Sequence, residues 1–186
     1  ADEAIGFEQV DDVLKQFEKG DLLLIQNEIS SLAYLIEKAH EKGMRIAFNV
    51  APMDDKVFQY PLHLVDYLLV NEVEAKELAK CDCKENEAII MALQKAYPKA
   101  EMVMTVGSEG SYYIHGEEVI HQKAFKVEAK DTTAVGDTFT GFFLAMILQG
   151  STIKEALQMA SKASSITVTR EGAAQSIPLM EEVRVW

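Results

Sequence analysis

One segment of the chain combines residue types that could carry out chemistry. Residues 130–143 read KDTTAVGDTFTGFF, with Asp131 before two hydroxyl residues and Asp137 after three small or aliphatic ones. The glycine and small residues at 134–136 allow backbone N–H groups to converge where a helix begins, and the helix dipole adds roughly half a positive charge there. A helix start of this kind binds phosphoryl groups. The segment therefore indicates an anion hole with a carboxylate at its edge.

Asp137 itself has two interpretations. A carboxylate beside a bound phosphate, with an alcohol nearby, is what a phosphotransferase needs as its base. Aspartate is also common at helix N-caps, where it only satisfies backbone N–H groups. The residue pattern by itself leaves both interpretations open.

Short apolar runs alternate with amphipathic stretches along the chain, and this alternation must position the segment. The runs predict strands at residues 22–25, 44–50, 67–70 and 101–106, and a hairpin of residues 111–114 and 118–121. The amphipathic stretches predict helices at residues 10–18, 30–42, 72–79, 85–97, 135–148 and 152–170. Such a pattern favours one α/β domain over residues 1–186 with a mostly parallel sheet. Ligands of such folds bind outside the carboxyl ends of the strands.

Residues 131–143 resemble the signature of the ribokinase-like (PfkB) sugar kinases, D-T-x-G-A-G-D-x-F. Further family motifs are similar in the same order: LLLIQNE at 22–28, NVAP at 49–52, NEVEAKEL at 71–78, TVGSEG at 105–110 and VTREGAAQSIP at 168–178. This resemblance implies a Rossmann-like, three-layer α/β/α ribokinase-like fold. It also implies that the chain is the C-terminal portion of a family member, with the N-terminal strands and the β-lid missing.

The resemblance implies a role for each matching residue of the reaction centre. Asp137 matches the base that takes a proton from the sugar hydroxyl, and it also contacts the substrate. The anion hole for the transferred phosphate is matched by Ala134, Val135 and Gly136. Glu28 matches a carboxylate that contacts the sugar.

The resemblance also implies cofactor sites. The motif that organises magnesium-bound phosphate, mostly through water, is matched by Asn71 and Glu74. The loop along the nucleotide is matched by Thr105, Gly107, Ser108 and Gly110. A loop that holds a monovalent cation, potassium in many relatives, is matched by Asp131, Thr133, Thr167, Arg170, Gly172 and Ser176. The expected cofactors are therefore ATP, Mg²⁺ and K⁺.

The sequence departs from the family pattern at three places. G-A-G-D is A-V-G-D here, and N-P-A-P is N-V-A-P. Family members also carry a longer N-terminal part with a glycine-rich sugar-binding stretch and the lid, which often dimerises. Because lid closure excludes water from the reaction, we expect little or no activity from this chain alone and a homodimer in the complete protein.

Composition narrows the class of partner. The chain has 18 basic and 30 acidic residues, a net charge of −12, which disfavours nucleic acids and anionic membranes as partners. No apolar run reaches the roughly 20 residues needed to span a bilayer, and residues 1–6 do not resemble a secretory signal. The two cysteines, Cys81 and Cys83, are expected to be reduced thiols on a polar loop of a cytoplasmic protein.

The expected function is transfer of the ATP γ-phosphate to a sugar hydroxyl. The C-terminal motif and the Q-x-E strand favour D-ribose as the sugar, giving ribose 5-phosphate, and fructose or another small sugar is the alternative. A second hypothesis from another class is a non-catalytic nucleotide-binding or interaction module derived from a kinase.

Overall fold

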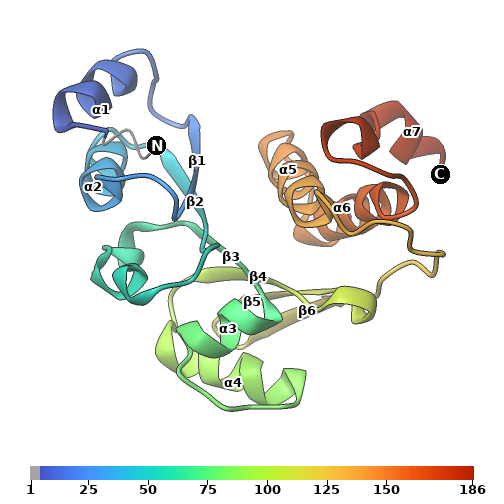
Figure 1. Cartoon of the computed structure of the whole chain (residues 1–186). Helices are drawn as coiled ribbons and strands as arrows, with labels where there is room; N and C mark the ends of the chain where they lie inside the picture. Colours follow the sequence, from blue (N-terminus) through green and yellow to red (C-terminus); the bar gives the residue numbers. More distant parts are fainter. Residues whose placement is uncertain (1–4) are drawn as a thin grey trace. The chain divides into compact units, whose positions relative to one another are not determined.

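The computed structural model describes residues 5–186 (Figure 1). These residues form two compact units. The first unit comprises the chain up to Val103 together with Ile114–Glu117, and the second comprises Met104–Tyr113 and Glu118–Trp186. The single domain expected from the sequence stays a prediction. Along residues 5–186, no helix combines the length and the apolar character that crossing a bilayer requires.

Helices and strands alternate along the chain, as the sequence pattern predicts. The strands are β1 (Leu22–Gln26), β2 (Arg45–Asn49), β3 (Tyr67–Asn71), β4 (Glu101–Thr105), β5 (Ser111–His115) and β6 (Glu118–Gln122). The α-helices are α1 (Phe7–Leu14), α2 (Leu32–Glu41), α3 (Glu72–Leu78), α4 (Asn86–Ala96), α5 (Val135–Leu148), α6 (Ile153–Thr167) and α7 (Met180–Val185). Short 3₁₀ turns are η1 (Asp55–Gln59), η2 (Leu62–Leu64), η3 (Gly107–Glu109) and η4 (Ala174–Ser176).

The described strands form one six-stranded sheet in the order β1-β2-β3-β4-β5-β6. Strand β1 pairs in parallel with β2, with Leu24 opposite Ala47, and β2 pairs in parallel with β3, with Phe48 opposite Leu68. Parallel neighbours need a crossover connection, which α2 provides between β1 and β2. The mostly parallel sheet of an α/β fold is therefore confirmed.

The core of the first unit forms where strands and helices bury their aliphatic side chains. On β2, Ile46 and Phe48 are fully buried, and so is Leu68 on β3. Helix α2 contributes Ile36 and Ala39, which are also fully buried. A continuous apolar strand such as β2 is stable only when both of its faces are covered, and these residues provide that cover.

The second unit is built around the pair α5 and α6, which lie side by side in Figure 1. Phe143 of α5 is fully buried, and α6 presents small buried residues such as Ala156 and Ala160, which allow two helices to approach closely. Helix α7 was not predicted from the sequence. Its single buried residue, Val183, packs on Ala163 and Ile166 of α6.

The first helix and strand differ from the prediction. Helix α1 begins three residues earlier than the predicted range 10–18 and ends at Leu14. The Gln9 side chain accepts a hydrogen bond from the Gly6 N–H at 2.8 Å, which starts the helix before the apolar pattern does. Strand β1 extends one residue beyond the predicted range 22–25, and because it lies at one end of the sheet order its Leu24 is 45% exposed.

Candidate functional site

Helix α5 begins abruptly at the predicted anion hole. Ala134 is its N-cap with φ 60° and ψ 8°, in the left-handed region, and the Thr138 N–H donates to the Ala134 carbonyl at 2.9 Å. The Val135 N–H makes only a long bond of 3.4 Å to the Thr132 carbonyl. The first N–H groups of a helix have no partner within it, so this end of α5 can receive an anion. Asp137 is exposed in the same first turn.

Helix α6 fixes the position of this helix start. The Ser164 hydroxyl donates to the Val135 carbonyl at 3.2 Å. Two buried hydroxyls, those of Thr167 and Thr138, are 3.2 Å apart and join the end of α6 to the first turn of α5. The side chain of Thr167, which resemblance places in the cation loop, is therefore used to hold α5.

Asp131 ties two loops together. Its Oδ1 accepts the Thr133 N–H at 2.8 Å and its Oδ2 accepts the Gly172 N–H at 3.0 Å. Hydrogen bonds from Thr133 and then from Gly172 lower the pKa of Asp131 from 3.8 to about 2, so the carboxylate is ionised at neutral pH. The Asp131 N–H also donates to the Val168 carbonyl at 3.2 Å. The structure thus brings together three residues of the predicted cation loop.

The other predicted cation-loop residues use their side chains locally. The Ser176 side chain is buried, and its hydroxyl donates to the Ala173 carbonyl at 2.6 Å. The Arg170 guanidinium forms an ion pair with Glu182 of α7 at 2.9 Å. Because a guanidinium has no lone pair to offer a cation, only the backbone carbonyl of Arg170 could act as a ligand.

The predicted nucleotide loop is a tight turn between β4 and β5. The Val106 N–H donates to the Gly110 carbonyl at 2.9 Å, which closes the turn around η3, where Gly107 and Ser108 lie. Gly110 has φ 109°, and a Cβ at this position would lie 2.0 Å from the Gln122 carbonyl oxygen. Only glycine fits so close an approach. Thr105 is the last residue of β4, directly before the turn.

His121 supports this turn, and the sequence analysis did not find it. Its Nε2 lies 3.0 Å from the Glu109 carbonyl oxygen in η3, and its ring stacks on Tyr112 with the centroids 4.2 Å apart. His121 comes from β6, twelve residues along the chain from Glu109. No local spacing signals this contact, because only the pairing of strands brings the two residues together.

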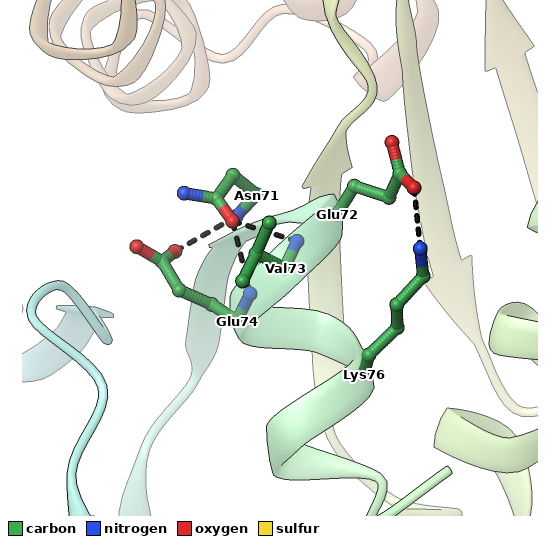
Figure 2. A network of polar contacts seen from close by, with 5 residues as sticks. All are labelled: Asn71, Glu72, Val73, Glu74 and Lys76. Carbon is green, nitrogen blue, oxygen red and sulfur yellow. Dashed lines mark hydrogen bonds and ion pairs between the residues drawn. The ribbon is translucent and has the colours of Figure 1, made fainter. Parts of the chain in front are cut away.

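Asn71 and Glu74 form a capping box at the start of α3 (Figure 2). The Asn71 Oδ1 accepts the N–H groups of Val73 and Glu74, each at 2.9 Å, and the Glu74 Oε2 accepts the Asn71 N–H at 2.8 Å. Burial raises the pKa of Glu74, and the bond from the Asn71 N–H partly opposes that rise. The amide nitrogen of Asn71 takes no part in these bonds.

Glu28 is exposed in the loop directly after β1, beside a polar network that the sequence analysis missed. The Nδ2 of Asn27 donates to the Pro52 carbonyl at 2.7 Å and to Asp54 Oδ1 at 3.1 Å, and the Tyr60 hydroxyl donates to Asn27 Oδ1 at 2.9 Å. The hydrogen bond from Asn27 lowers the pKa of Asp54. The network joins the loops that follow β1 and β2, at the strand ends where α/β proteins bind ligands.

The predicted residues are divided between the two units. Glu28, Asn71 and Glu74 belong to the first unit. All the other predicted site residues belong to the second unit. Within residues 5–186, the structure shows no group of three or more His, Cys, Asp or Glu side chains arranged to hold a metal ion.

The fold is that of an α/β protein, and its helix α5 begins at the predicted anion hole with Asp137 exposed in the first turn. The chain belongs to the pfkB family of carbohydrate kinases, whose model matches residues 2–180. It is 35% identical over 176 residues to the ribokinase of Schizosaccharomyces pombe. This match covers 88% of this chain and 54% of that protein. Against the ribokinase of Haemophilus influenzae the identity is 32% over 174 residues, covering 90% and 56%. The chain thus spans about half the length of the curated relatives it matches.

Solved structures agree with this assignment. A structure of Arabidopsis thaliana ribokinase complexed with ribose and ATP superposes with a TM-score of 0.86 at 27% identity, covering 98% of this chain and 59% of that one. A ribokinase from Cryptococcus neoformans in complex with ADP superposes with a TM-score of 0.79 at 28% identity, covering 88% and 59%. The predicted ribokinase-like fold is confirmed.

Two substitutions of Asn71 test whether its side chain stabilises the start of α3. We expect Asn71→Ala to lower the free energy of unfolding by about 1 kcal/mol, because two backbone N–H groups lose their acceptor. Asn71→Asp keeps an acceptor oxygen at the N-cap and should stay close to wild type. Urea unfolding of the three proteins checks this. Equal losses for Ala and Asp would contradict the capping role.

Ala134 occupies a backbone conformation that favours glycine, at a position where the family signature has glycine. We expect Ala134→Gly to raise the free energy of unfolding by about 1 kcal/mol, because an L-residue is strained in the left-handed region. The matched control is Ala145→Gly in the middle of α5, which should lower it by roughly 0.5–1 kcal/mol. Thermal or urea unfolding measures both, and a loss at both positions would contradict the prediction.

Asp131 should contribute to stability only when it is ionised. Asp131→Asn replaces one acceptor oxygen with a donor group, so one of the two loop N–H groups loses its partner. The folded pKa of Asp131 is depressed, so its contribution is fully present above pH about 4 and is lost as the pH falls towards about 2. Urea unfolding across this pH range should show the wild-type advantage shrinking. Asp12→Asn, at an exposed ion pair with Lys15, is the control and should change little.

Proposed function

We propose that this chain is the nucleotide-binding and catalytic portion of a kinase that transfers the γ-phosphate of ATP to a sugar hydroxyl, with D-ribose as the first candidate substrate. The observation that carries the proposal is the start of α5, where Asp137 stands exposed in a first turn held against α6. The relatives of this chain include ribokinases, and one ribokinase structure is complexed with ribose and ATP. Fructose or another small sugar is the alternative substrate.

The proposed reaction assigns one step to each group of the second unit. Asp137 takes the proton of the sugar hydroxyl, whose oxygen then attacks the γ-phosphorus while the bond to the ADP oxygen breaks. The N–H groups of residues 134–136 stabilise the negative charge on the transferred phosphoryl group. The glycine turn at residues 107–110 lies along the nucleotide, and Gly110 allows this turn to pass close to the backbone of Gln122.

The residues present fit magnesium and potassium. Glu74 and Asn71 offer the oxygen-rich, partly buried environment that suits magnesium held through water. When bound, magnesium would neutralise phosphate charge. The ionised Asp131, held by N–H groups of Thr133 and Gly172, would supply negative charge for a monovalent cation. When bound, potassium would shape the anion hole.

On resemblance alone we also propose a cytoplasmic location and a homodimer for the whole protein.

A second candidate is a nucleotide-binding or interaction module without catalysis. It corresponds to the interpretation in which Asp137 is only an acidic residue of the first turn of α5. Titration of the chain with Mg-ATP, with and without potassium, followed by an ADP-release assay with ribose, tests both. Nucleotide binding with ribose-dependent ADP release supports the kinase. Binding without release is also expected of a kinase portion that lacks its lid, so the Asp137→Asn comparison in the complete protein then separates the two candidates. Absence of nucleotide binding would argue against the kinase and against a nucleotide-binding module, and would leave an interaction module.

Asp137→Asn tests the base directly. In the complete protein, we expect ribose-dependent ADP release to fall by about 10²- to 10⁴-fold, because the sugar hydroxyl loses its proton acceptor. The dissociation constant for Mg-ATP should stay near that of wild type, since the backbone N–H groups are unchanged. The control is Glu181→Gln in α7, an exposed acid outside the predicted site residues, which should leave both values unchanged. Turnover unaffected by Asp137→Asn would exclude Asp137 as the base.

A further inference from the structure

The two cysteines form a dithiol that the proposed kinase reaction does not use. Cys81 and Cys83 are the only cysteines in the chain, with Asp82 between them. They lie in the short loop between α3 and α4, and both are half-exposed. A hydrogen bond with Cys81 raises the pKa of Cys83. With one residue between them and both side chains half-exposed, the two thiols are close along the chain and accessible to a reagent in solution.

The backbone around the dithiol is fixed at one side and irregular at the other. Lys80 adopts a left-handed conformation with φ 51°, and the Cys81 N–H donates to the Lys76 carbonyl at 3.0 Å. The Lys80 N–H donates to the Glu77 carbonyl at 3.0 Å, so α3 ends in a Schellman motif. Residues 82–84 have no regular structure. Cys81 is thus held in place while Cys83 stands on chain that can adjust.

Ring closure lies within reach of this loop. Two residues of chain span at most about 7 Å between Cα atoms, and disulfides join Cα atoms roughly 4.4–6.8 Å apart. A closed metal site is a poorer explanation of the pair, because structural zinc takes four ligands and no group of three or more metal-binding side chains occurs among residues 5–186. The arrangement suits an intrachain disulfide.

We propose that Cys81 and Cys83 are a site of reversible two-electron oxidation by low-molecular-weight disulfides such as glutathione disulfide. The Cys81 thiolate attacks one sulfur of glutathione disulfide, which forms a mixed disulfide and releases one glutathione. Cys83 then loses its proton, and its sulfur attacks the Cys81 sulfur and releases the second glutathione. Two protein thiols are oxidised to one disulfide while glutathione disulfide is reduced to two thiols.

Backbone geometry orders the two attacks. Because the Schellman motif holds Cys81 while Cys83 lies in irregular chain, the first attack is assigned to Cys81 and the ring-closing attack to Cys83. The dithiol follows α3, whose N-cap residue Asn71 belongs to the predicted phosphate motif.

Incubation of the folded chain with glutathione disulfide tests the proposal. We expect loss of both free thiols, a mass decrease of two hydrogens and a monomer on a non-reducing gel, all reversed by dithiothreitol. Cys83→Ser should instead accumulate one glutathione adduct on Cys81, and Cys81→Ser should react more slowly. Two unreacted thiols, two glutathione adducts on one chain, or a disulfide-linked dimer would each overturn the proposal.

The same reaction, carried out on the chain unfolded in urea, shows whether the folded structure positions Cys81 and Cys83 for ring closure. We expect the mixed disulfide to close into the ring more slowly in the unfolded chain, because the Schellman motif that holds Cys81 is then lost. Equal rates of closure in both states would contradict a prepared site. Since neither assay uses nucleotide or sugar, its outcome is independent of whether the proposed kinase activity is found.

Discussion

The packing of α5 against α6 is the constraint on which the candidate site depends. A helix start can receive a phosphoryl group only if its N–H groups are held in place and left unpaired. Buried hydroxyls of Thr138 and Thr167 join the two helices at this end, and Ser164 holds the Val135 carbonyl. Both threonine side chains are buried, so the bond between their hydroxyls gains strength from its exclusion from water.

Several candidate site residues stabilise the local fold through hydrogen bonds of one part of the side chain. Another property of the same side chain, a free donor group or a charge, remains for a ligand. Asn71 caps α3 through its oxygen while its amide nitrogen stays outside the cap. Asp131 accepts N–H groups from two loops with its two oxygens and still carries a negative charge. Because one side chain serves both purposes, we expect the loss of such a residue to affect folding and ligand binding together. A conservative replacement is needed to separate the effect on folding from the effect on binding.

The motifs of the sequence name the candidate site residues, whereas the residues that support them come from elsewhere in the chain. The α5 segment was predicted with its observed bounds because Gly136 and a long apolar run mark a buried helix start. The supports of the turn at Gly110 and of the loop at Asn27 were missed. His121 reaches Glu109 through strand pairing, and Tyr60 reaches Asn27 across more than thirty residues. Neither contact leaves a periodic or local pattern. Helix α7 was also missed, because only Val183 is buried along it.

The sequence by itself determined the alternation of strands and helices, the family and the residues of its signature, because apolar periodicity and local backbone chemistry are written in neighbouring positions. Tertiary structure alone decided that Ala134 takes the left-handed conformation of a glycine and that Thr167 holds α5. It also decided that Arg170 pairs with Glu182 and that Leu24 stands exposed. Each of these depends on which distant segment packs against the residue, and that choice is made by burial of the whole core rather than by any local stretch of chain.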